Sequence, residues 1–279
     1  HQSELSQSAV KQYAVAHNIP VLQPEKLKDP DFLEELRSYR ADLQVIVAFR
    51  MLPEAVWDMP PHGTFNLHAS LLPQYRGAAP INWAIINGDT ETGVTTFLLD
   101  HEIDTGRIIH QARTPITEED NVETVHDRLR DIGAGVVTQT VDDIIAGNIR
   151  PIDQDTLTAD TEIRHAPKIF KDTCRLAFDL PVKRAFDFVR GMSPYPAAWT
   201  ELVEENGKRT MLKIYATTRE ETTVAEAPGT VLTDGKTYFK IAFPDGYLAL
   251  TQLQLAGKKR MTVSDFLRGY HPEGTLRAE

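Results

Sequence analysis

The chain has 279 residues, enough for two domains, and its 41% hydrophobic and 25% charged residues are typical of a globular protein. No apolar stretch reaches the roughly 18 residues that a membrane-spanning helix needs, and a net charge of −10 argues against a simple nucleic-acid binder. The charge is uneven, because residues 1–168 carry a net −12 and residues 169–279 a net +2. A neutral-to-basic second part on an acidic first part indicates two parts with different roles.

The first half of the chain alternates helical and extended patterns. Asp29 is a suitable N-cap for the helix that follows, and Pro30 occupies the first helical position, where an amide N–H is not needed. The apolar run at 42–49 is typical of a strand that is buried on both faces. Helices are predicted at 8–17, 29–40, 52–59, 79–89 and 121–147, and strands at 19–24, 42–49, 63–69, 93–100 and 106–116. Strands that alternate with helices predict a parallel, doubly wound, Rossmann-like sheet of the α/β class.

The pattern changes after a polar connector at 148–170. One helix is predicted at 179–192 and a last short one at 261–269. Between them lie hairpin-like strands with Asn-Gly and Asp-Gly turns, which favour tight antiparallel connections. Several short strands of this kind predict a small β-barrel, for which an OB-like fold is the first choice. The expected division of the chain is into a first domain at 1–147, a linker at 148–170 and a C-terminal domain at 171–279.

Polar side chains gather at two predicted strand ends. Alternate residues of a strand share a face, so Asn66 and His68 point the same way near the end of their strand. Asp104 lies in a tight loop after the next strand, and ligands of open α/β sheets sit at such strand ends. A hydrogen-bonded pair that closes the strand end is the simpler interpretation of Asn66 and His68, and a surface charge is the simpler one for Arg76.

An amide, an imidazole and a carboxylate around one site suit acyl transfer to an amine. The amide and an imidazolium stabilise an oxyanion, while a carboxylate beside the ring favours its charged form and helps to move protons. A Ser–His–Asp hydrolase is the obvious alternative, because Ser70 lies two residues from His68. That serine lacks the G-x-S-x-G turn of such enzymes, which argues against a hydrolase.

Longer stretches carry a resemblance to a known family. The segment FNLHASLLPQYRGAAPINWAIINGDTETGVT, together with DTG at 104–106, closely resembles the 10-formyltetrahydrofolate-dependent formyltransferases. In the second half, RGMSPYPAAWTE (190–201), PGTVL (228–232) and LQLAGKKRM (253–261) are similar to the methionyl-tRNA-formylating branch of that superfamily. The resemblance covers nearly the whole chain. It also implies that the first strand-helix-strand unit of the family is missing, because SQSAVKQYA resembles the segment just after that unit.

The resemblance implies roles for the three polar residues. Asn66 and His68 would hold the oxyanion that develops when the methionyl α-amino group attacks the formyl carbon of 10-formyltetrahydrofolate. Asp104, through a water, would help to move the proton from the amine towards N10 of the folate. Enzymes of this kind use 10-formyltetrahydrofolate as a cosubstrate and need no metal.

The resemblance also implies two folate-contacting segments. They are the turn Ser70-Leu71-Leu72-Pro73 and the pterin-pocket wall Arg50-Met51-Leu52. We expect the Leu72–Pro73 peptide to be cis, because a sharp turn directly after a strand is where cis-proline occurs. The chain reads FRML where many relatives have a glycine-containing segment, so core packing is a competing interpretation of Met51 and Leu52.

The implied partner is initiator methionyl-tRNA, bound by a basic face of the C-terminal domain that follows the phosphate backbone. The candidate residues, each equally consistent with a solvated turn, are Lys208, Arg209, Lys258, Lys259 and Arg260. The single cysteine, Cys174, cannot pair within the chain and fits a reducing, cytoplasmic setting. We expect a monomer that binds no membrane.

Three other functions use the same residues. A formyltransferase for a small amine, such as a nucleotide-sugar, would share the three polar residues but have little use for a basic barrel. A hydrolase would release formate from the same folate. A folate- or RNA-binding module would tolerate substitution of His68 and Asp104, whereas the enzyme would not.

Overall fold

The computed structural model describes residues 7–48 and 51–279. The chain forms two compact units, residues 1–65 and 66–279. In the first unit, α2 begins as predicted, because the Asp29 side chain accepts a hydrogen bond from the Asp31 amide at 3.0 Å. The elements of this unit are α1 (Ala9–Ala16), α2 (Pro30–Ser38), β1 (Gln44–Val47), α3 (Glu54–Trp57) and the start of β2 (Thr64–His68).

Two predictions for the first unit are wrong. Residues 19–24 form no strand. Pro20 and Pro24, near the two ends of this segment, lack the amide N–H that a sheet ladder requires. β1 is not buried on both faces, since the side chains of Val45 and Val47 are 39% and 55% exposed. The strand therefore alternates in burial, as a strand with one covered face does.

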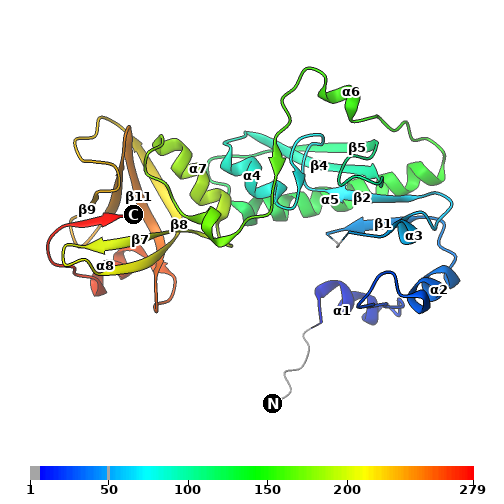
Figure 1. Ribbon diagram of the computed structural model, residues 1–279, viewed down its shortest axis with the longest axis horizontal. Coiled ribbons are helices and arrows are strands. Elements are labelled where there is room, and N and C mark those ends of the chain that lie inside the picture. The colour runs from blue at the N-terminus through cyan, green and yellow to red at the C-terminus, as the bar shows by residue number, and fades with distance from the viewer. Residues whose placement is uncertain (1–6, 49–50) are drawn as a thin grey trace, which may run out of the picture. The chain divides into compact units, whose positions relative to one another are not determined.

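The first sheet has the strand order β1-β2-β4-β5. β4 (Glu91–Leu98) and β5 (Ile108–Pro115) are antiparallel, which corrects the prediction of a wholly parallel sheet. Only residues 99–107 connect these two strands, and a parallel pair would need a longer crossover. α5 (Val122–Ile145) packs against β4 and β5, and α4 (Pro80–Ile86) precedes β4 in the chain (Figure 1).

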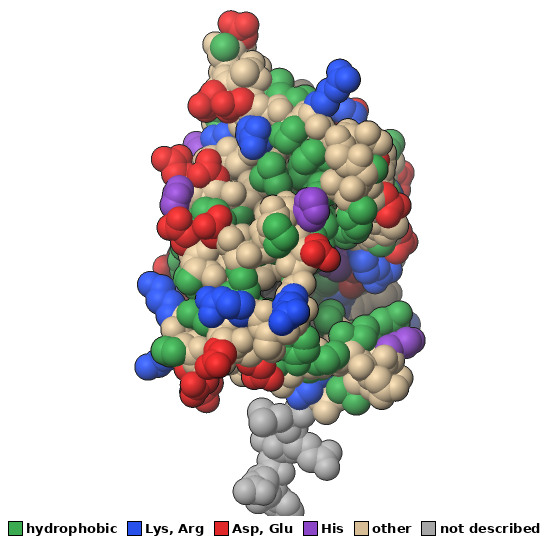
Figure 2. Space-filling view, turned by 90° about the vertical axis from the view of Figure 1, so that its right-hand side faces the viewer, with side chains coloured by type: hydrophobic (Ala, Val, Ile, Leu, Met, Phe, Trp, Pro, Cys, Tyr) green, Lys and Arg blue, Asp and Glu red, His purple; other side chains and the backbone are tan. Residues whose placement is uncertain are grey.

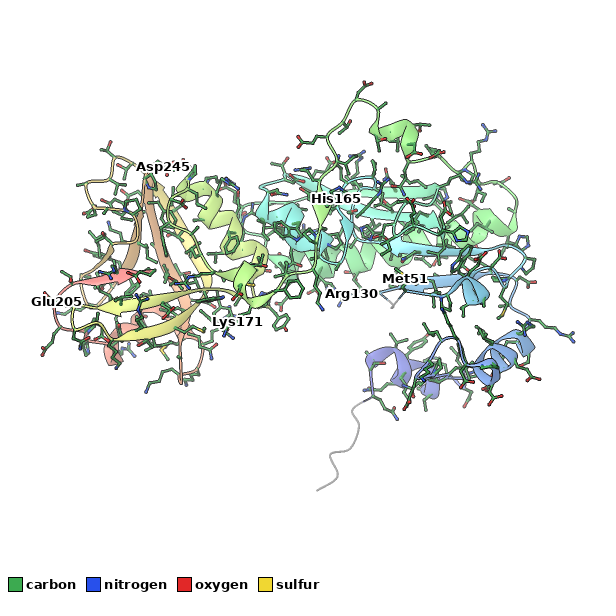
Figure 3. The ribbon with its side chains drawn as sticks, in the orientation of Figure 1. Met51, Arg130, His165, Lys171, Glu205 and Asp245 are labelled. Carbon is green, nitrogen blue, oxygen red and sulfur yellow. The ribbon has the colours of Figure 1, made fainter. Side chains whose placement is uncertain are left out.

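The connector is more ordered than its polar sequence indicates. It contains α6 (Asp155–Thr158), the two-residue strand β6 (His165–Ala166) and a 3₁₀ turn at Lys171–Cys174. β6 pairs in parallel with β3 (Arg76–Gly77), a strand that the sequence did not predict (Figure 3, label His165). Gly77 has φ +130°, and a Cβ there would lie 2.4 Å from the carbonyl oxygen of Ala166, so only glycine fits this close pairing.

The second sheet is antiparallel and has the order β13-β7-β8-β11-β10-β9, with β12 paired to β11. A bridge between Thr230 and Arg277 brings its two edges together, so the sheet is a nearly closed barrel, as predicted. α7 (Val182–Met192) packs on it and begins where Asp245 accepts a hydrogen bond from the Val182 amide at 2.8 Å (Figure 3). The other elements are β7 (Ala198–Glu204), β8 (Arg209–Glu221), β9 (Val231–Thr233), β10 (Phe239–Phe243), β11 (Gly246–Leu255), β12 (Met261–Thr262), α8 (Val263–Gly269) and β13 (Leu276–Ala278).

Asp120 holds the start of α5 and is almost fully buried. Its carboxylate accepts hydrogen bonds from both terminal nitrogens of Arg128 and from the Thr117 amide and the Thr124 hydroxyl. Burial opposes the charge, but these donors outweigh it and lower the pKa of Asp120 to about 2. The ionised carboxylate therefore stabilises the fold above the ordinary carboxyl pKa, and the contribution is lost as the pH falls towards 2.

We expect Asp120→Asn to lower the free energy of unfolding by about 2 kcal/mol at pH 7, the equivalent of a pKa shift of this size. The free energy of unfolding of the unmodified chain should fall between pH 4 and 2, and that of the variant should fall less over the same range. Denaturant unfolding across this pH range measures both effects, with the exposed Asp131→Asn as control. Parallel pH profiles for the Asp120 variant and the unmodified chain would contradict the assignment.

Candidate active site

The carboxyl end of β2 presents the predicted histidine. His68 is 7% exposed, and its Nε2 lies 2.8 Å from the carbonyl oxygen of Tyr75. A carbonyl oxygen only accepts hydrogen bonds, so Nε2 carries a proton and donates it to Tyr75. Nδ1 is therefore the ring nitrogen that remains for proton transfer or for contact with a substrate.

Asp104 faces that nitrogen, as the sequence predicted. Its Oδ2 lies 3.8 Å from Nδ1 of His68 and also accepts a hydrogen bond from the Gly77 amide at 3.0 Å. Asp104 has φ +58°, a left-handed conformation that is unusual for a residue other than glycine. Such strained positions cluster at functional sites. The Asp104 carboxylate is thus the acidic group that faces the free ring nitrogen of His68.

Tyr75, which orients the histidine, is itself held from three sides. Its hydroxyl donates to Asp89 at 2.8 Å, and its amide donates to the carbonyl oxygen of Arg164 in the connector at 2.7 Å. The Arg164 guanidinium forms two hydrogen bonds with Asp89 and lies 4.7 Å from the Tyr75 ring centre. Burial above all raises the pKa of Tyr75 well beyond its ordinary value, so the hydroxyl stays protonated and keeps donating. The carbonyl that receives Nε2 of His68 is thereby fixed.

Asn66 lies two residues before His68 on β2, on the same face of the strand. Among the described residues its side-chain amide forms no hydrogen bond, so both amide protons are free to contact a substrate. A half-buried unpaired amide beside an imidazole is the donor arrangement that stabilises a tetrahedral oxyanion. The structure thus brings the histidine and carboxylate together and leaves the amide available on the same strand.

The turn after β2 has the predicted cis peptide between Leu72 and Pro73. The turn is tightly packed: Ser70 is fully buried and its hydroxyl donates to the Gln74 carbonyl at 2.6 Å, while Leu72 is 2% exposed. Leu71 is only partly buried. A folate contact from these four residues stays a prediction, and this packing favours the partly exposed Leu71 side chain as the contacting group.

The remaining candidate residues are those of the second predicted folate segment and Arg76. Arg50 is outside the described residues. Met51 is 69% exposed, which does not support the interpretation that it is a core residue, whereas Leu52 is partly buried. Their contribution to a folate pocket stays a prediction. Arg76, the presumed surface charge, instead donates two hydrogen bonds to the side chain of Gln154 at 3.1 and 2.8 Å.

The basic candidates lie in or directly beside two turns of the barrel, and all five residues are exposed. The β7–β8 turn carries Lys208, Arg209 follows as the first residue of β8, and the β11–β12 turn carries Lys258, Lys259 and Arg260. Leu212 of β8 pairs with Leu255 of β11, which brings the two turns to the same end of the barrel. Arg260 stacks on Tyr215 at 4.3 Å, and Arg209 pairs with Glu279 at 2.5 Å, so these two charges are partly engaged.

Gln154 and Tyr75 are the residues of this site that the sequence did not reveal. Gln154 lies in the polar connector, and its side chain is almost completely buried. Tyr75 acts through its backbone carbonyl, which no sequence pattern identifies. In the described parts of the chain, no three His, Cys, Asp or Glu side chains gather to hold a metal ion, and no helix is long and apolar enough to cross a bilayer.

Comparisons with known proteins identify the family of the chain. A family model described as formyl transferase matches residues 1–141, and one described as the formyl transferase C-terminal domain matches residues 168–271. The methionyl-tRNA formyltransferase of Parabacteroides distasonis is 62% identical over 271 residues, which are 97% of this chain and 84% of the relative. The chain belongs to the methionyl-tRNA formyltransferase family.

Further matches support the family and the fold. The methionyl-tRNA formyltransferase of Bacteroides fragilis is 56% identical over 268 residues, 96% of this chain and 83% of that protein. The solved structure of WlaRD, a sugar 3N-formyltransferase in the presence of dTDP and 5-N-formyl-THF, aligns with a TM-score of 0.63 and 19% identity. The alignment covers 91% of this chain and 83% of WlaRD, and at this identity it shows a shared fold. The predicted superfamily and fold class are confirmed.

Proposed function

We propose that this chain transfers the formyl group of 10-formyltetrahydrofolate to the α-amino group of methionine on initiator methionyl-tRNA. The observation that carries the proposal is the His68–Asp104 pair beside the unpaired amide of Asn66. Relatives of 56–62% identity that are methionyl-tRNA formyltransferases support this substrate. The product is the charged tRNA used in translation initiation.

The proposed reaction needs an oxyanion site and a proton route. The methionyl nitrogen attacks the formyl carbon, and the tetrahedral oxyanion accepts hydrogen bonds from the Asn66 amide and from Nδ1–H of His68. The new carbon–nitrogen bond forms as the bond from the formyl carbon to N10 of the folate breaks. The amine loses a proton and N10 gains one, and Asp104 relays this proton, so no net charge is left on either product.

The folate contacts, the domain division, the oligomeric state and the location of the protein are parts of the same proposal. Folate would contact Ser70, Leu71, Leu72 and Pro73 and also Arg50, Met51 and Leu52. We propose that residues 1–147 form the catalytic domain, 148–170 the linker and 171–279 the tRNA-binding domain. Because all three catalytic residues come from one chain, we propose a monomer. Its tRNA substrate and the single buried thiol of Cys174 support a cytoplasmic setting.

The acceptor is tested by a formylation assay with 10-formyltetrahydrofolate and three samples: initiator methionyl-tRNA, a dTDP-amino sugar, and no acceptor. We expect formyl-methionyl-tRNA to form, with little transfer to the sugar and little free formate. Faster transfer to the sugar would favour the small-amine enzyme. Formate release without any acceptor would favour the hydrolase, and binding without turnover would favour a binding module.

Binding of tRNA by the barrel predicts a salt dependence. On the face drawn in Figure 2, the described Lys and Arg side chains are interspersed with Asp and Glu, whereas the β11–β12 turn gathers three adjacent cations. We expect the double variant Lys258→Ala/Lys259→Ala to bind tRNA about tenfold more weakly and to lower the slope of log affinity against log salt by about 2.

Fluorescence titrations of tRNA at several salt concentrations measure both quantities. The control is Arg130→Ala on α5, an exposed arginine (Figure 3) whose charge is already paired with Asp127 and Asp131. An affinity that does not change with salt, or an equal loss in the control, would argue against the basic turn.

A further inference from the structure

The connector carries a buried polar side chain that the chemistry above does not use. Gln154 precedes α6 and is only 1% exposed. Two residues earlier, Ile152 exchanges two backbone hydrogen bonds with Ile108 at the start of β5, both at 2.8 Å. These bonds fix the connector beside the loop that carries Asp104, which ends where β5 begins.

All hydrogen-bonding groups of the Gln154 amide are used. Nε2 donates to the carbonyl oxygen of Asp104 at 2.8 Å and to that of Gly106 at 2.6 Å. Oε1 accepts from Nε and Nη2 of Arg76 at 3.1 and 2.8 Å. A guanidinium only donates and a carbonyl only accepts, so this pattern leaves a single orientation of the amide.

These bonds hold the catalytic carboxylate from two directions. Asp104 has φ +58°, and its backbone carbonyl is bound by Gln154. Its carboxylate is bound by the amide of Gly77, the residue next to Arg76. A Cβ at Gly106 would lie 1.5 Å from the Leu98 carbonyl oxygen, so the loop has little room to shift as a whole. Loss of the Gln154 bonds would thus free the backbone of Asp104 itself.

We propose that Gln154 is a positioning residue that holds the Asp104 carboxylate in range of His68 and thereby sets the rate of formyl transfer. This inference rests on the proposed function. Without the two donated hydrogen bonds, the left-handed backbone at Asp104 relaxes and the carboxylate moves away from Nδ1. A displacement of about 1 Å at a reacting group lowers the rate by up to about 100-fold.

The first variant is Gln154→Met, which keeps the length of the side chain and removes all four hydrogen bonds. We expect kcat to fall by about 10- to 100-fold, with KM for the folate and for methionyl-tRNA changed less than about twofold. The control is Trp83→Phe on α4. It removes the hydrogen bond from the indole to the Pro167 carbonyl of the connector and leaves the hydrogen bonds of the Asp104 loop in place. It should keep kcat.

A double variant separates positioning from general stability. If Gln154 acts through the Asp104 carboxylate, then Gln154→Met should lower the single-turnover rate much less in an Asp104→Asn background than in the unmodified chain. If Gln154→Met lowered the single-turnover rate by the same factor in the Asp104→Asn background, Gln154 would act only on the fold. That result would overturn the proposal.

The variant Gln154→Glu covers the case in which the methionine variant does not fold. It keeps an oxygen for Arg76 but replaces both donated hydrogen bonds with repulsion against two carbonyl oxygens. A normal kcat in this folded variant would overturn the positioning role while leaving the proposed function intact. An unmodified chain that formylates no methionyl-tRNA in the same series would instead overturn the proposed function, and this inference with it.

Discussion

Asp104→Asn should lower kcat/KM for methionyl-tRNA by about 10³-fold while leaving the melting temperature nearly unchanged. The asparagine keeps the volume of the side chain and an oxygen to accept the Gly77 amide, which now lies 3.0 Å from the carboxylate. It removes the negative charge that faces Nδ1 of His68, and with it the group that we propose relays the proton. Steady-state formylation and thermal unfolding measure the two properties side by side.

The control for this substitution is Asp100→Asn. Asp100 is exposed in the same loop region and accepts a hydrogen bond from the neighbouring His101 amide. It should retain normal activity. If the Asp104 variant kept most of its activity, the carboxylate would have no part in proton transfer, and a comparable loss at Asp100 would show that the loop is merely sensitive to charge.

Asn66→Ala should lower kcat by about 10²- to 10³-fold, because one oxyanion donor is lost. Its effect on stability should be small, since no described residue hydrogen-bonds with the amide. Asn66→Asp should be slower still, because a carboxylate there would repel the developing oxyanion. Single-turnover transfer with saturating folate measures the chemical step.

The exposed Asn148→Ala, at the end of the connector nearest α5, serves as the matched control and should leave kcat unchanged. A higher KM with an unchanged kcat in Asn66→Ala would show that the amide binds the substrate and the transition state equally. The oxyanion role would then have to be abandoned.

Local signals in the sequence predicted most elements correctly. The N-cap at Asp29 and the turn pairs of the barrel depend on a few neighbouring residues, so they can be recognised without knowledge of the fold. The antiparallel pairing of β4 with β5 was missed, although the short connection between the two predicted strands, residues 101–105, leaves no room for a parallel crossover. The false strand at 19–24 was apolar enough, but its two prolines remove the amide groups that a ladder uses.

The site was predictable only where chemistry follows strand periodicity and family resemblance. Asn66 and His68 share a face because they are two residues apart, and Asp104 follows the neighbouring strand. The contact of Gln154 with the Asp104 loop could not be predicted, because it joins positions that are far apart in the sequence, and the contact of Tyr75 with His68 uses a backbone carbonyl. Both depend on backbone conformations with positive φ, at Tyr75 and at Asp104, which side-chain patterns do not specify.

The most direct test of the central claim is single-turnover formyl transfer from 10-formyltetrahydrofolate to initiator methionyl-tRNA. The unmodified chain and the double variant Asn66→Ala/Asp104→Asn are measured in parallel. If the polar residues act as one unit around the formyl carbon, the unmodified chain formylates the tRNA, and the double variant is hardly slower than the slower single variant. An inactive unmodified chain, or a double variant that transfers formyl at the normal rate, would contradict the account.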